Sequence, residues 1–328
     1  MSAAREHKRG ISAALFLLVG VLLLGGETGA AAPRHRHPIA LGAYVSSAAH
    51  PLRLRRYSRA AGRPPLIAAS YKQWRLSPFP PSELKPMWRD GAVPLVTWEP
   101  WTYREKPFPL RKVAAGRYDG YLRSAARAAA RWRHPILLRF AHEMNGDWYP
   151  WGADRVTPHV YKAAWRHVVS IFRANGADNV RWVWTPYVDS QGRFPFAAFY
   201  PGDRWVDWVG LDGFNWGGRR GWLSFGEIFS HSLHLLARLS SRPVMIAETG
   251  SSEIGGNKAS WVRRALTREL PRMRRVQALV WFSRPFNGID MRVDSSQAAL
   301  RALRRGARLP LYRADRASLL RSTSRRGS

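Results

Sequence analysis

Two glutamates far apart in the chain each lie at the end of a short apolar run. Glu143 comes shortly after the apolar run at residues 135–138, and Glu248 directly follows the run at residues 244–247. Runs of about four or more apolar residues are typical of buried strands. Because an ionisable group left unpaired at the edge of a core costs several kcal/mol, we expect both carboxyl groups to face a polar cleft.

Aromatic residues follow Glu143 within a few positions: Trp148, Tyr149 and Trp151. An aromatic face accepts the C–H face of a sugar ring, and a neighbouring carboxyl group handles the glycosidic oxygen. A single glutamate at a strand end is more often a solvated loop residue, and a tryptophan-rich turn is more often core. The second glutamate changes that balance, because two carboxyl groups at the ends of two buried strands are what glycoside hydrolysis requires.

Eight short apolar runs alternate with amphipathic stretches through most of the chain. We expect strands at Ile39–Val45, Leu66–Ser70, Val93–Trp98, Ile136–Phe140, Val180–Thr185, Val206–Phe214, Val244–Glu248 and Ala278–Ser283. Eight buried strands that alternate with helices predict an α/β fold in which a parallel sheet closes into a (β/α)8 barrel, the TIM barrel.

The stretches between the strands carry the signals that begin and end helices. Ser82 is expected to cap a helix that stops at Gly91, and Thr157 precedes a proline at the first helical position. Residues 224–227 read as a capping box. The connection at residues 189–204 is too rich in Pro and Gly for a long helix. Further helices are expected at Tyr118–Arg131, Lys258–Met273 and Ser296–Arg305.

Polar and aromatic residues gather where the predicted strands end. In a (β/α)8 barrel the carboxyl ends of the strands hold the active site, so segments far apart in the sequence converge there. The segments are Trp98-Glu99-Pro100-Trp101, His142-Glu143, Trp184-Thr185-Pro186-Tyr187, Asp212-Gly213-Phe214-Asn215-Trp216, Glu248 and Trp281.

The residues quoted above resemble glycoside hydrolase family 26, best known for secreted endo-β-1,4-mannanases. The resemblance runs from about Leu41 to Arg304 and is strongest over Arg139–Gly152, with support from residues 200–203, 207–212 and 246–248. It implies a retaining mechanism on a (β/α)8 barrel.

The same resemblance implies a role for individual residues. Glu143, in the string His-Glu-Met-Asn-Gly, would be the general acid/base, and Glu248 the nucleophile. Substrate-binding roles are expected for the remaining site residues: His142, which helps to order the site, Trp148 on the leaving-group side, Trp281 under the sugar being cleaved, and Asn145, Trp98 and Phe214.

The chain departs from the family pattern at Phe214, where the family usually has a tyrosine whose hydroxyl lies near the nucleophile. A hydrogen bond to a charged group contributes about 1.5–3 kcal/mol. We therefore expect Glu248 to be held less firmly, with reduced activity or a shifted pH optimum.

Three further polar residues have two interpretations each. Arg139 either keeps Glu248 ionised or forms a structural ion pair inside the barrel. Asp212 either orients a neighbour or caps a loop, and we favour the loop cap. Glu99 either contacts a distal sugar or pairs with an arginine. The mechanism itself requires Glu248 to lose its proton first, because its charge then raises the pKa of Glu143.

Composition excludes several classes of protein. The 328 residues contain no cysteine, which rules out disulfides, thiol catalysis and Cys-based metal sites. We predict no cofactor and no metal. The net charge is +31, but the 53 basic residues include only seven Lys and the Arg are spread along the chain without a nucleic-acid-reading module. We expect electrostatic adsorption to anionic envelope polymers and no specific nucleic-acid binding.

Four segments are predicted along the chain. Residues 1–32 resemble a signal peptide, so we expect a secreted protein with no membrane span after cleavage; an uncleaved anchor is the alternative. Residues 33–38 form a basic linker and residues 39–308 the glycosidase catalytic domain. Residues 309–328, rich in Arg and Ser, are expected to be a loosely ordered tail.

The partner predicted from these residues is a β-linked polysaccharide of the mannan type. A β-1,3-1,4-glucanase, a β-1,3-xylanase and an exopolysaccharide hydrolase of the same family stay open as alternatives. So does a protein that binds polysaccharide without cleaving it, which the intact glutamates disfavour.

Overall fold

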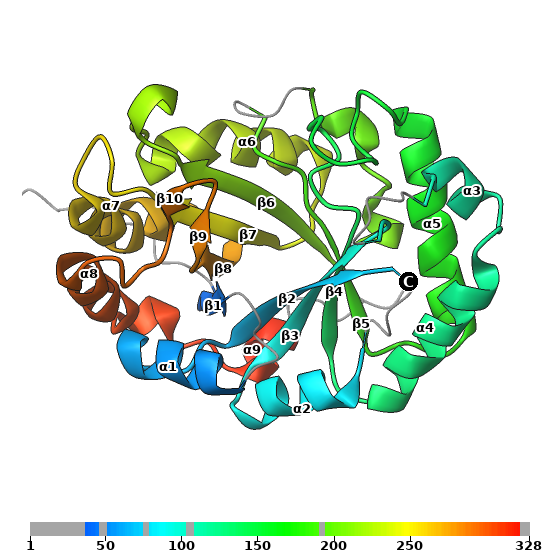
Figure 1. Ribbon diagram of the computed structural model, residues 1–328, viewed down its shortest axis with the longest axis horizontal. Coiled ribbons are helices and arrows are strands. Elements are labelled where there is room, and N and C mark those ends of the chain that lie inside the picture. The colour runs from blue at the N-terminus through cyan, green and yellow to red at the C-terminus, as the bar shows by residue number, and fades with distance from the viewer. Residues whose placement is uncertain (1–36, 46–50, 75–78, 103–107, 190–193, 322–328) are drawn as a thin grey trace, which may run out of the picture. The chain divides into compact units, whose positions relative to one another are not determined.

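The apolar runs of the sequence form the inner wall of a closed parallel barrel. The computed structural model describes residues 37–45, 51–74, 79–102, 108–189 and 194–321, and in it eight parallel strands pair in chain order, with β8 pairing back to β1. Figure 1 shows the strands surrounded by helices, which confirms the predicted (β/α)8 fold. The strands are β1 Ala40–Tyr44, β2 Ile67–Gln73, β3 Val93–Glu99, β4 Ile136–Phe140, β5 Val180–Trp184, β6 Trp208–Asn215, β7 Val244–Ser251 and β8 Val276–Phe282.

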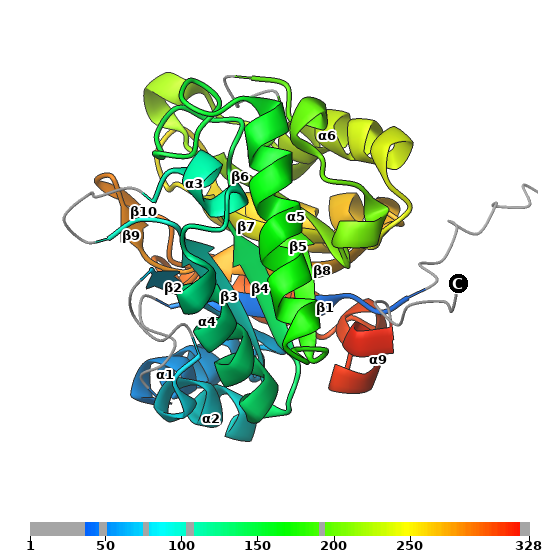
Figure 2. The same ribbon diagram turned by 90° about the vertical axis from the view of Figure 1, so that its right-hand side faces the viewer.

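The helices form the outer layer, and their apolar faces pack on the strands. They are α1 Pro51–Ala61, α2 Pro81–Arg89, α3 Leu110–Ala114, α4 Asp119–Trp132, α5 Pro158–Ala174, α6 Phe225–Leu239, α7 Lys258–Arg264, α8 Gln297–Ala307 and α9 Arg316–Arg321. Figure 2 shows α4 and α5 side by side on the outside of the barrel. A short hairpin, β9 Pro285–Phe286 and β10 Ile289–Asp290, follows β8.

The predicted helix starts hold where a side chain caps the backbone. Thr157 accepts from the Val160 amide at the start of α5, and Ser224 and Glu227 form the capping box of α6. Between β5 and β6, the described residues contain only two single-turn 3₁₀ helices, Ala197–Phe199 and Asp203–Trp205, as the Pro and Gly content predicts.

Two helix predictions are wrong at their ends. α2 begins at Pro81, one residue before Ser82, because proline is already set for the first helical position and Pro80 stands in the cap. The helix expected over residues 258–273 is α-helical only to Arg264. A π-helical turn and a 3₁₀ turn then continue it, and the 3₁₀ turn contains Pro271, which lacks the amide that an α-helix needs.

The prediction of a loosely ordered tail is wrong for residues 309–321. The carbonyl of Leu311 accepts from the Ile39 amide just before β1, and the fully buried Tyr312 donates to the carbonyl of Leu266 at 2.5 Å. Leu319 of α9 is also buried. Buried side chains hold this segment against the barrel together with hydrogen bonds from Arg63 to the Tyr312 carbonyl and from Arg316 to the Gly91 carbonyl.

The predicted signal peptide and most of the basic linker lie outside the described residues. None of the helices in the described ranges has the length and apolar character needed to cross a membrane.

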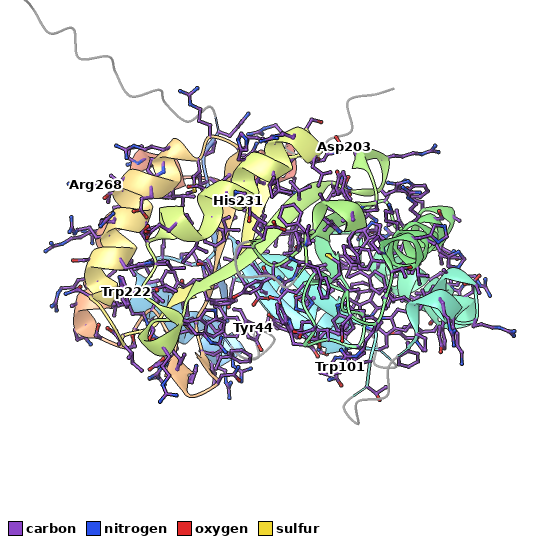
Figure 3. The ribbon with its side chains drawn as sticks, turned by 90° about the horizontal axis from the view of Figure 1, so that it is seen from above. Tyr44, Trp101, Asp203, Trp222, His231 and Arg268 are labelled. Carbon is purple, nitrogen blue, oxygen red and sulfur yellow. The ribbon has the colours of Figure 1, made fainter. Side chains whose placement is uncertain are left out.

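The two ends of the barrel differ in the residues that they carry. Tyr44 is the last residue of β1, and Trp101 lies just beyond β3; Figure 3 shows both in the lower half of the view. Asp203, which comes before β6, lies near the upper edge of the same view. Asp203 accepts hydrogen bonds from Tyr200, Ser240 and Ser241, so it is a structural residue of the amino end. The candidate chemistry lies at the carboxyl end.

Candidate active site

Arg139 of β4 is the centre of the polar groups inside the barrel. Its guanidinium, fully buried, donates to both carboxylate oxygens of Asp212 at 3.0 and 2.8 Å and to the Thr97 hydroxyl at 3.0 and 2.7 Å. It also donates to Oε1 of Glu248. Arg139 thus forms a structural ion pair with Asp212 and also contacts Glu248.

Asp212 is therefore not the loop cap favoured from the sequence. Its side chain is fully buried on β6 and pairs with Arg139, which corrects that expectation. A lone strand-end aspartate is commonly a cap, but here Arg139 reaches it across the barrel. The carboxyl groups of Asp212 and Glu143 also hydrogen-bond each other.

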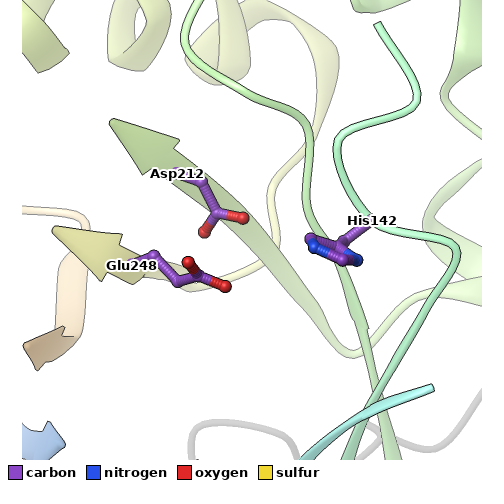
Figure 4. A group of neighbouring side chains, drawn as sticks. All are labelled: His142, Asp212 and Glu248. Atoms are coloured by element: carbon purple, nitrogen blue, oxygen red, sulfur yellow. The ribbon is translucent and has the colours of Figure 1, made fainter. Parts of the chain in front are cut away.

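A register shift between β6 and β7 sets the direction of Glu248. Leu211 pairs with Ile246, but the next residue, Asp212, pairs with Glu248, so Ala247 is an extra residue in β7. Bulges of this kind redirect a side chain and are common beside active sites. Figure 4 shows the result, in which Asp212 and Glu248 extend from neighbouring strands toward His142.

Glu248 is surrounded by donors. It is 4% exposed, and its Oε1 accepts from Arg139 and from the hydroxyl of Tyr71 on β2. Burial raises the pKa of Tyr71 well above its usual range, so this hydroxyl keeps its proton and donates it. A guanidinium and a phenol thus hold this carboxylate oxygen in position.

The backbone after β4 turns sharply to present Glu143. Ala141 and Glu143 have φ values of +42° and +52°, which non-glycine residues adopt rarely. Hydrogen bonds to neighbouring strands hold the turn: the Ala141 amide donates to the Trp98 carbonyl at 3.1 Å and the Glu143 amide to the Thr185 carbonyl at 2.8 Å. Strain of this type at a rigidly held turn is common at functional sites.

Glu143 lies in the opposite electrostatic environment from Glu248. Burial raises the pKa of Glu143 to about 8, and the charge of Glu248 acts in the same direction. The indole Nε1 of Trp148 donates to Oε2 of Glu143 at 2.6 Å and partly offsets this rise, as does the charge of Arg139. At neutral pH Glu143 therefore keeps its proton.

His142 is buried beside these carboxyl groups and is neutral. Burial, followed by the charge of Arg139, lowers its pKa well below the usual range. Its ring packs against Tyr149 at 4.8 Å, and neither ring nitrogen has a hydrogen-bond partner among the described residues. Buried polar atoms of this kind usually have a partner, which singles out both nitrogens.

Ligand atoms of His142, Asp212 and Glu248 all lie within 4.8 Å of one another, a spacing that a metal ion could bridge. The guanidinium of Arg139 already donates to both carboxylates and supplies their counter-charge. A second cation between them would be repelled, so this group fits charge balance by Arg139 better than metal binding.

Glu99 lies at the end of β3 on the same inner face. Gln73 pairs with Glu99, and Tyr71 pairs with Thr97, so these residues alternate inward along β2 and β3. Burial raises the pKa of Glu99 to about 7, opposed by the hydrogen bond that Trp101 Nε1 donates at 3.1 Å. No ion pair joins Glu99 to an arginine among the described residues, which leaves the expected sugar contact open.

Two of the predicted aromatic residues reach the site. Trp148 donates to Glu143 and has 44% of its surface exposed, so its ring remains accessible to solvent. Phe214 packs 5.5 Å from Phe282 and 6.4 Å from Tyr187. Glu248 nevertheless accepts from a phenol, because Tyr71 supplies a hydroxyl from β2, and the effect of Phe214 on activity stays a prediction.

The structure does not bring Trp98 or Trp281 into the cleft. Trp98 pairs with Phe140 in register, and its buried indole donates to Tyr121 of α4 at 3.3 Å. Trp281 donates to the Met291 carbonyl and packs 6.0 Å from Trp261 of α7. Successive strand residues point to opposite faces, and both indoles lie on the outer one.

The structure gives Asn145, expected from the sequence to bind substrate, a contact with the protein backbone. Its side chain donates to the Tyr187 carbonyl at 2.9 Å and accepts from the Tyr187 amide at 2.8 Å, and the residue is fully buried. Each end of the amide is engaged by the same backbone unit, so Asn145 fastens the loop after β4 to the loop after β5.

Sequence reasoning missed the inward-facing neighbours of these residues. Phe282 follows Trp281 and pairs with Tyr44, whose ring lies 5.1 Å from Phe282 and 4.7 Å from Tyr71. Tyr71 follows the apolar run of β2 at an alternate position, so a strand prediction extended by one residue beyond Ser70 would have included it.

The fold and the site together define a (β/α)8 barrel with several buried carboxyl groups at the carboxyl ends of its strands. The model of glycosyl hydrolase family 26 matches residues 117–230. Endoglucanase H of Acetivibrio thermocellus is 40% identical over 227 residues, which cover 66% of this chain and 24% of that protein. The chain is similar in sequence to glycoside hydrolase family 26.

Other relatives match shorter parts of the chain. A mannan endo-1,4-beta-mannosidase of Bifidobacterium adolescentis is 36% identical over 80 residues, 24% of this chain and 8% of that protein. The chain therefore spans a quarter or less of the length of these two curated relatives. A modular endo-β-1,4-mannanase from Cellulomonas fimi has the same fold, with a TM-score of 0.65 at 18% identity over 85% of this chain and 72% of that one.

Proposed function

We propose that the protein is a retaining, endo-acting glycoside hydrolase of β-linked polysaccharide, in which Glu248 is the nucleophile and Glu143 the general acid/base. The observation that carries the proposal is the contrast between the two carboxyl groups. Glu248 accepts from a guanidinium and a phenol, whereas burial and the charge of Glu248 raise the pKa of Glu143 to about 8. A pair of titratable groups whose environments push their pKa values apart indicates which group acts as acid and which as base.

In the first step, Glu248 attacks the anomeric carbon of the bound sugar while Glu143 gives its proton to the leaving glycosidic oxygen. The glycosyl ester bond forms as the glycosidic bond breaks, and the leaving sugar departs with a hydroxyl group. Arg139 and Tyr71 hold Glu248 in position for this attack. Trp148, exposed next to Glu143, offers its ring to the leaving sugar.

In the second step, the negative charge of Glu248 is absent because the residue is esterified. The charge that raised the pKa of Glu143 is then gone, so Glu143 loses its proton more readily and acts as base toward water. Water attacks the anomeric carbon, and the ester bond breaks to regenerate the Glu248 carboxylate. Two displacements at one carbon leave its configuration unchanged.

The backbone sugar has two candidates. Mannan is the substrate expected from the sequence, and the names of relatives such as the Bifidobacterium mannosidase support it. β-Glucan is the second candidate, because the match to an endoglucanase extends over 66% of this chain, against 24% for that mannosidase.

A reducing-sugar assay on mannan, glucomannan, mixed-linkage β-glucan and β-1,3-xylan tests the proposal and separates the candidates. We expect turnover on one β-linked polysaccharide by the wild type and loss of about a thousandfold or more in Glu143→Ala and Glu248→Ala. Thr267→Ala on the outer surface serves as the matched control. Full activity in either glutamate variant would refute the assignment. Binding without turnover would favour the non-catalytic alternative.

We also propose export, on the grounds of the basic start and apolar stretch within residues 1–32. Expression of the full chain followed by amino-terminal sequencing of the protein in the medium tests this. A new amino terminus near residue 33 supports export, and retention of the whole chain in the cell membrane would favour the uncleaved anchor.

A further inference from the structure

Aromatic rings continue outward from the catalytic cleft onto the hairpin that follows β8. Phe282, the inward ring of β8, lies 5.5 Å from Phe214 and 5.8 Å from Phe286 of β9. Trp216, just after β6, lies 5.1 Å from Phe214 and 6.2 Å from Phe286. Phe286 has 41% of its surface exposed. The outermost ring of this series is thus open to solvent, although the others are largely covered.

The hairpin that carries Phe286 is firmly held. Asn287 and Gly288, with φ values of +49° and +75°, form the tight turn between β9 and β10. Lys258 of α7 is buried, and its ammonium group donates to the carbonyls of Asp290 and Arg292 at 3.0 and 2.6 Å and to the Ser295 hydroxyl at 2.8 Å. Because Lys258 donates to three oxygens of the segment that follows the turn, it fixes the hairpin that carries the exposed Phe286.

Trp216 is held from two sides. Its indole Nε1 donates to the hydroxyl of Tyr187 at 3.0 Å, and the guanidinium of the exposed Arg220 stacks over its ring at 4.7 Å. Arg220 therefore places a hydrogen-bond donor for sugar hydroxyls beside the aromatic series, and the exposed Phe286 ring offers the face on which the C–H face of a sugar can stack.

We propose that Phe286, Trp216 and Arg220 form a sugar-binding subsite for the polysaccharide chain that occupies the catalytic cleft, at a position beyond the two sugars joined by the scissile bond. Phe286 supplies the platform, Trp216 supports it, and Arg220 binds ring hydroxyls. The proposal rests on the proposed function for its substrate. The occupant follows from continuity, because the rings lead without interruption from Phe214 and Phe282 at the site to the solvent-exposed hairpin.

The test compares Phe286→Ala with the matched control Leu52→Ala, another exposed apolar residue, on α1 of the outer layer. The substrates are the cleaved polysaccharide and its tri- to hexasaccharides. We expect kcat/KM of Phe286→Ala to fall about tenfold on the polysaccharide and the hexasaccharide, because a subsite contact is lost. We expect Phe286→Ala to leave kcat/KM on the trisaccharide unchanged and Leu52→Ala to leave it unchanged on every substrate. Phe286→Trp, which keeps an aromatic ring, should retain kcat/KM on the polysaccharide and the hexasaccharide. Equal losses at all lengths, or none, would overturn the subsite.

A binding measurement separates this proposal from the proposed function. Glu143→Gln, which prevents turnover under the proposed mechanism, is titrated calorimetrically with the hexasaccharide and the trisaccharide of mannan and of mixed-linkage glucan, with and without Phe286→Ala. A loss of hexasaccharide affinity on removal of Phe286 supports the subsite even where the wild type shows no hydrolysis. Unchanged hexasaccharide affinity in an active enzyme refutes the subsite and leaves the proposed function intact.

Discussion

Arg139 explains how several carboxyl groups coexist in one buried site. It forms a bidentate pair with Asp212 and donates to Glu248, while Glu143 is left without a cationic hydrogen-bond donor. The one guanidinium thus contacts two of these carboxyl groups, whereas burial and the charge of Glu248 raise the pKa of the third, Glu143, to about 8. Under the proposed mechanism, the position of this guanidinium distinguishes the nucleophile from the acid.

Replacement of Trp148 changes the pKa of Glu143 without changing the glutamate itself. Its Nε1 donates to the ionised form of Glu143 and lowers a pKa that burial has raised to about 8. The acid form is needed for catalysis, so activity falls as pH rises through this pKa. We expect Trp148→Phe to move the alkaline limb of the kcat/KM profile above its wild-type position, because the donor that favoured ionisation is removed.

The control for this prediction is Trp101→Phe, which removes an indole donor from Glu99 instead of Glu143. An alkaline limb that stays in place or moves to lower pH in Trp148→Phe would contradict the role assigned to the Trp148 to Glu143 hydrogen bond.

Tyr71 carries the second prediction at this scale. Tyr71→Phe removes the phenol donor from Glu248, and loss of a hydrogen bond to a charged group costs about 1.5–3 kcal/mol, or roughly 10- to 150-fold in kcat. Phe214→Tyr in the wild-type background is expected to change kcat little, because Glu248 already has a phenol partner. Tyr44→Phe, in the adjacent ring, is the control. Wild-type kcat in Tyr71→Phe would show that Glu248 does not depend on this hydroxyl.

Individual elements were predictable to the extent that their signals are local. The eight strands and the caps at Thr157 and Ser224 follow from apolar runs and capping side chains, and the structure confirms them. The direction of a side chain at a strand end was not predictable, because it depends on register. Trp98 and Trp281 differ from inward positions by one residue, and the extra residue Ala247 in β7 has no sequence signal.

Residues 309–321 test how an element with weak local signals is held. Deletion of residues 309–328 removes the buried side chains of Tyr312 and Leu319 and the acceptor of the Ile39 amide. We expect it to lower the free energy of unfolding by about 3–5 kcal/mol. Deletion of residues 322–328 alone is the matched control and should leave the urea midpoint unchanged. Equal urea midpoints for both truncated proteins would support the original prediction that the tail is loosely ordered.

At the scale of the whole molecule, the charge of +31 acts apart from the catalytic site. The arginines are distributed along the chain, and the acidic residues Glu143, Asp212 and Glu248 are buried together inside the barrel. A surface of this kind attracts polyanions by long-range electrostatics, whereas recognition of a neutral polysaccharide depends on the cleft. The two kinds of binding should therefore respond differently to salt.

Adsorption to immobilised polygalacturonate measures the first kind. We expect the wild type and Glu143→Gln to bind equally at low ionic strength and to lose about tenfold or more in affinity on addition of 0.5 M salt (roughly a 4 Å Debye length). Binding of neutral oligosaccharide should persist in that salt. Adsorption that survives the salt, or that is lost in Glu143→Gln, would contradict a general electrostatic origin.

The central claim is that Glu248 forms a covalent bond to the sugar, and a trapped intermediate tests it most directly. The enzyme is incubated with 2,4-dinitrophenyl 2-deoxy-2-fluoro-β-mannobioside and with the corresponding β-cellobioside, then digested and examined by peptide mass spectrometry. We predict a fluoroglycosyl ester on Glu248, formed with one of the two reagents and absent in Glu248→Gln. A label on a different residue, or no label from either reagent on an enzyme that hydrolyses the matching polysaccharide, would contradict the account.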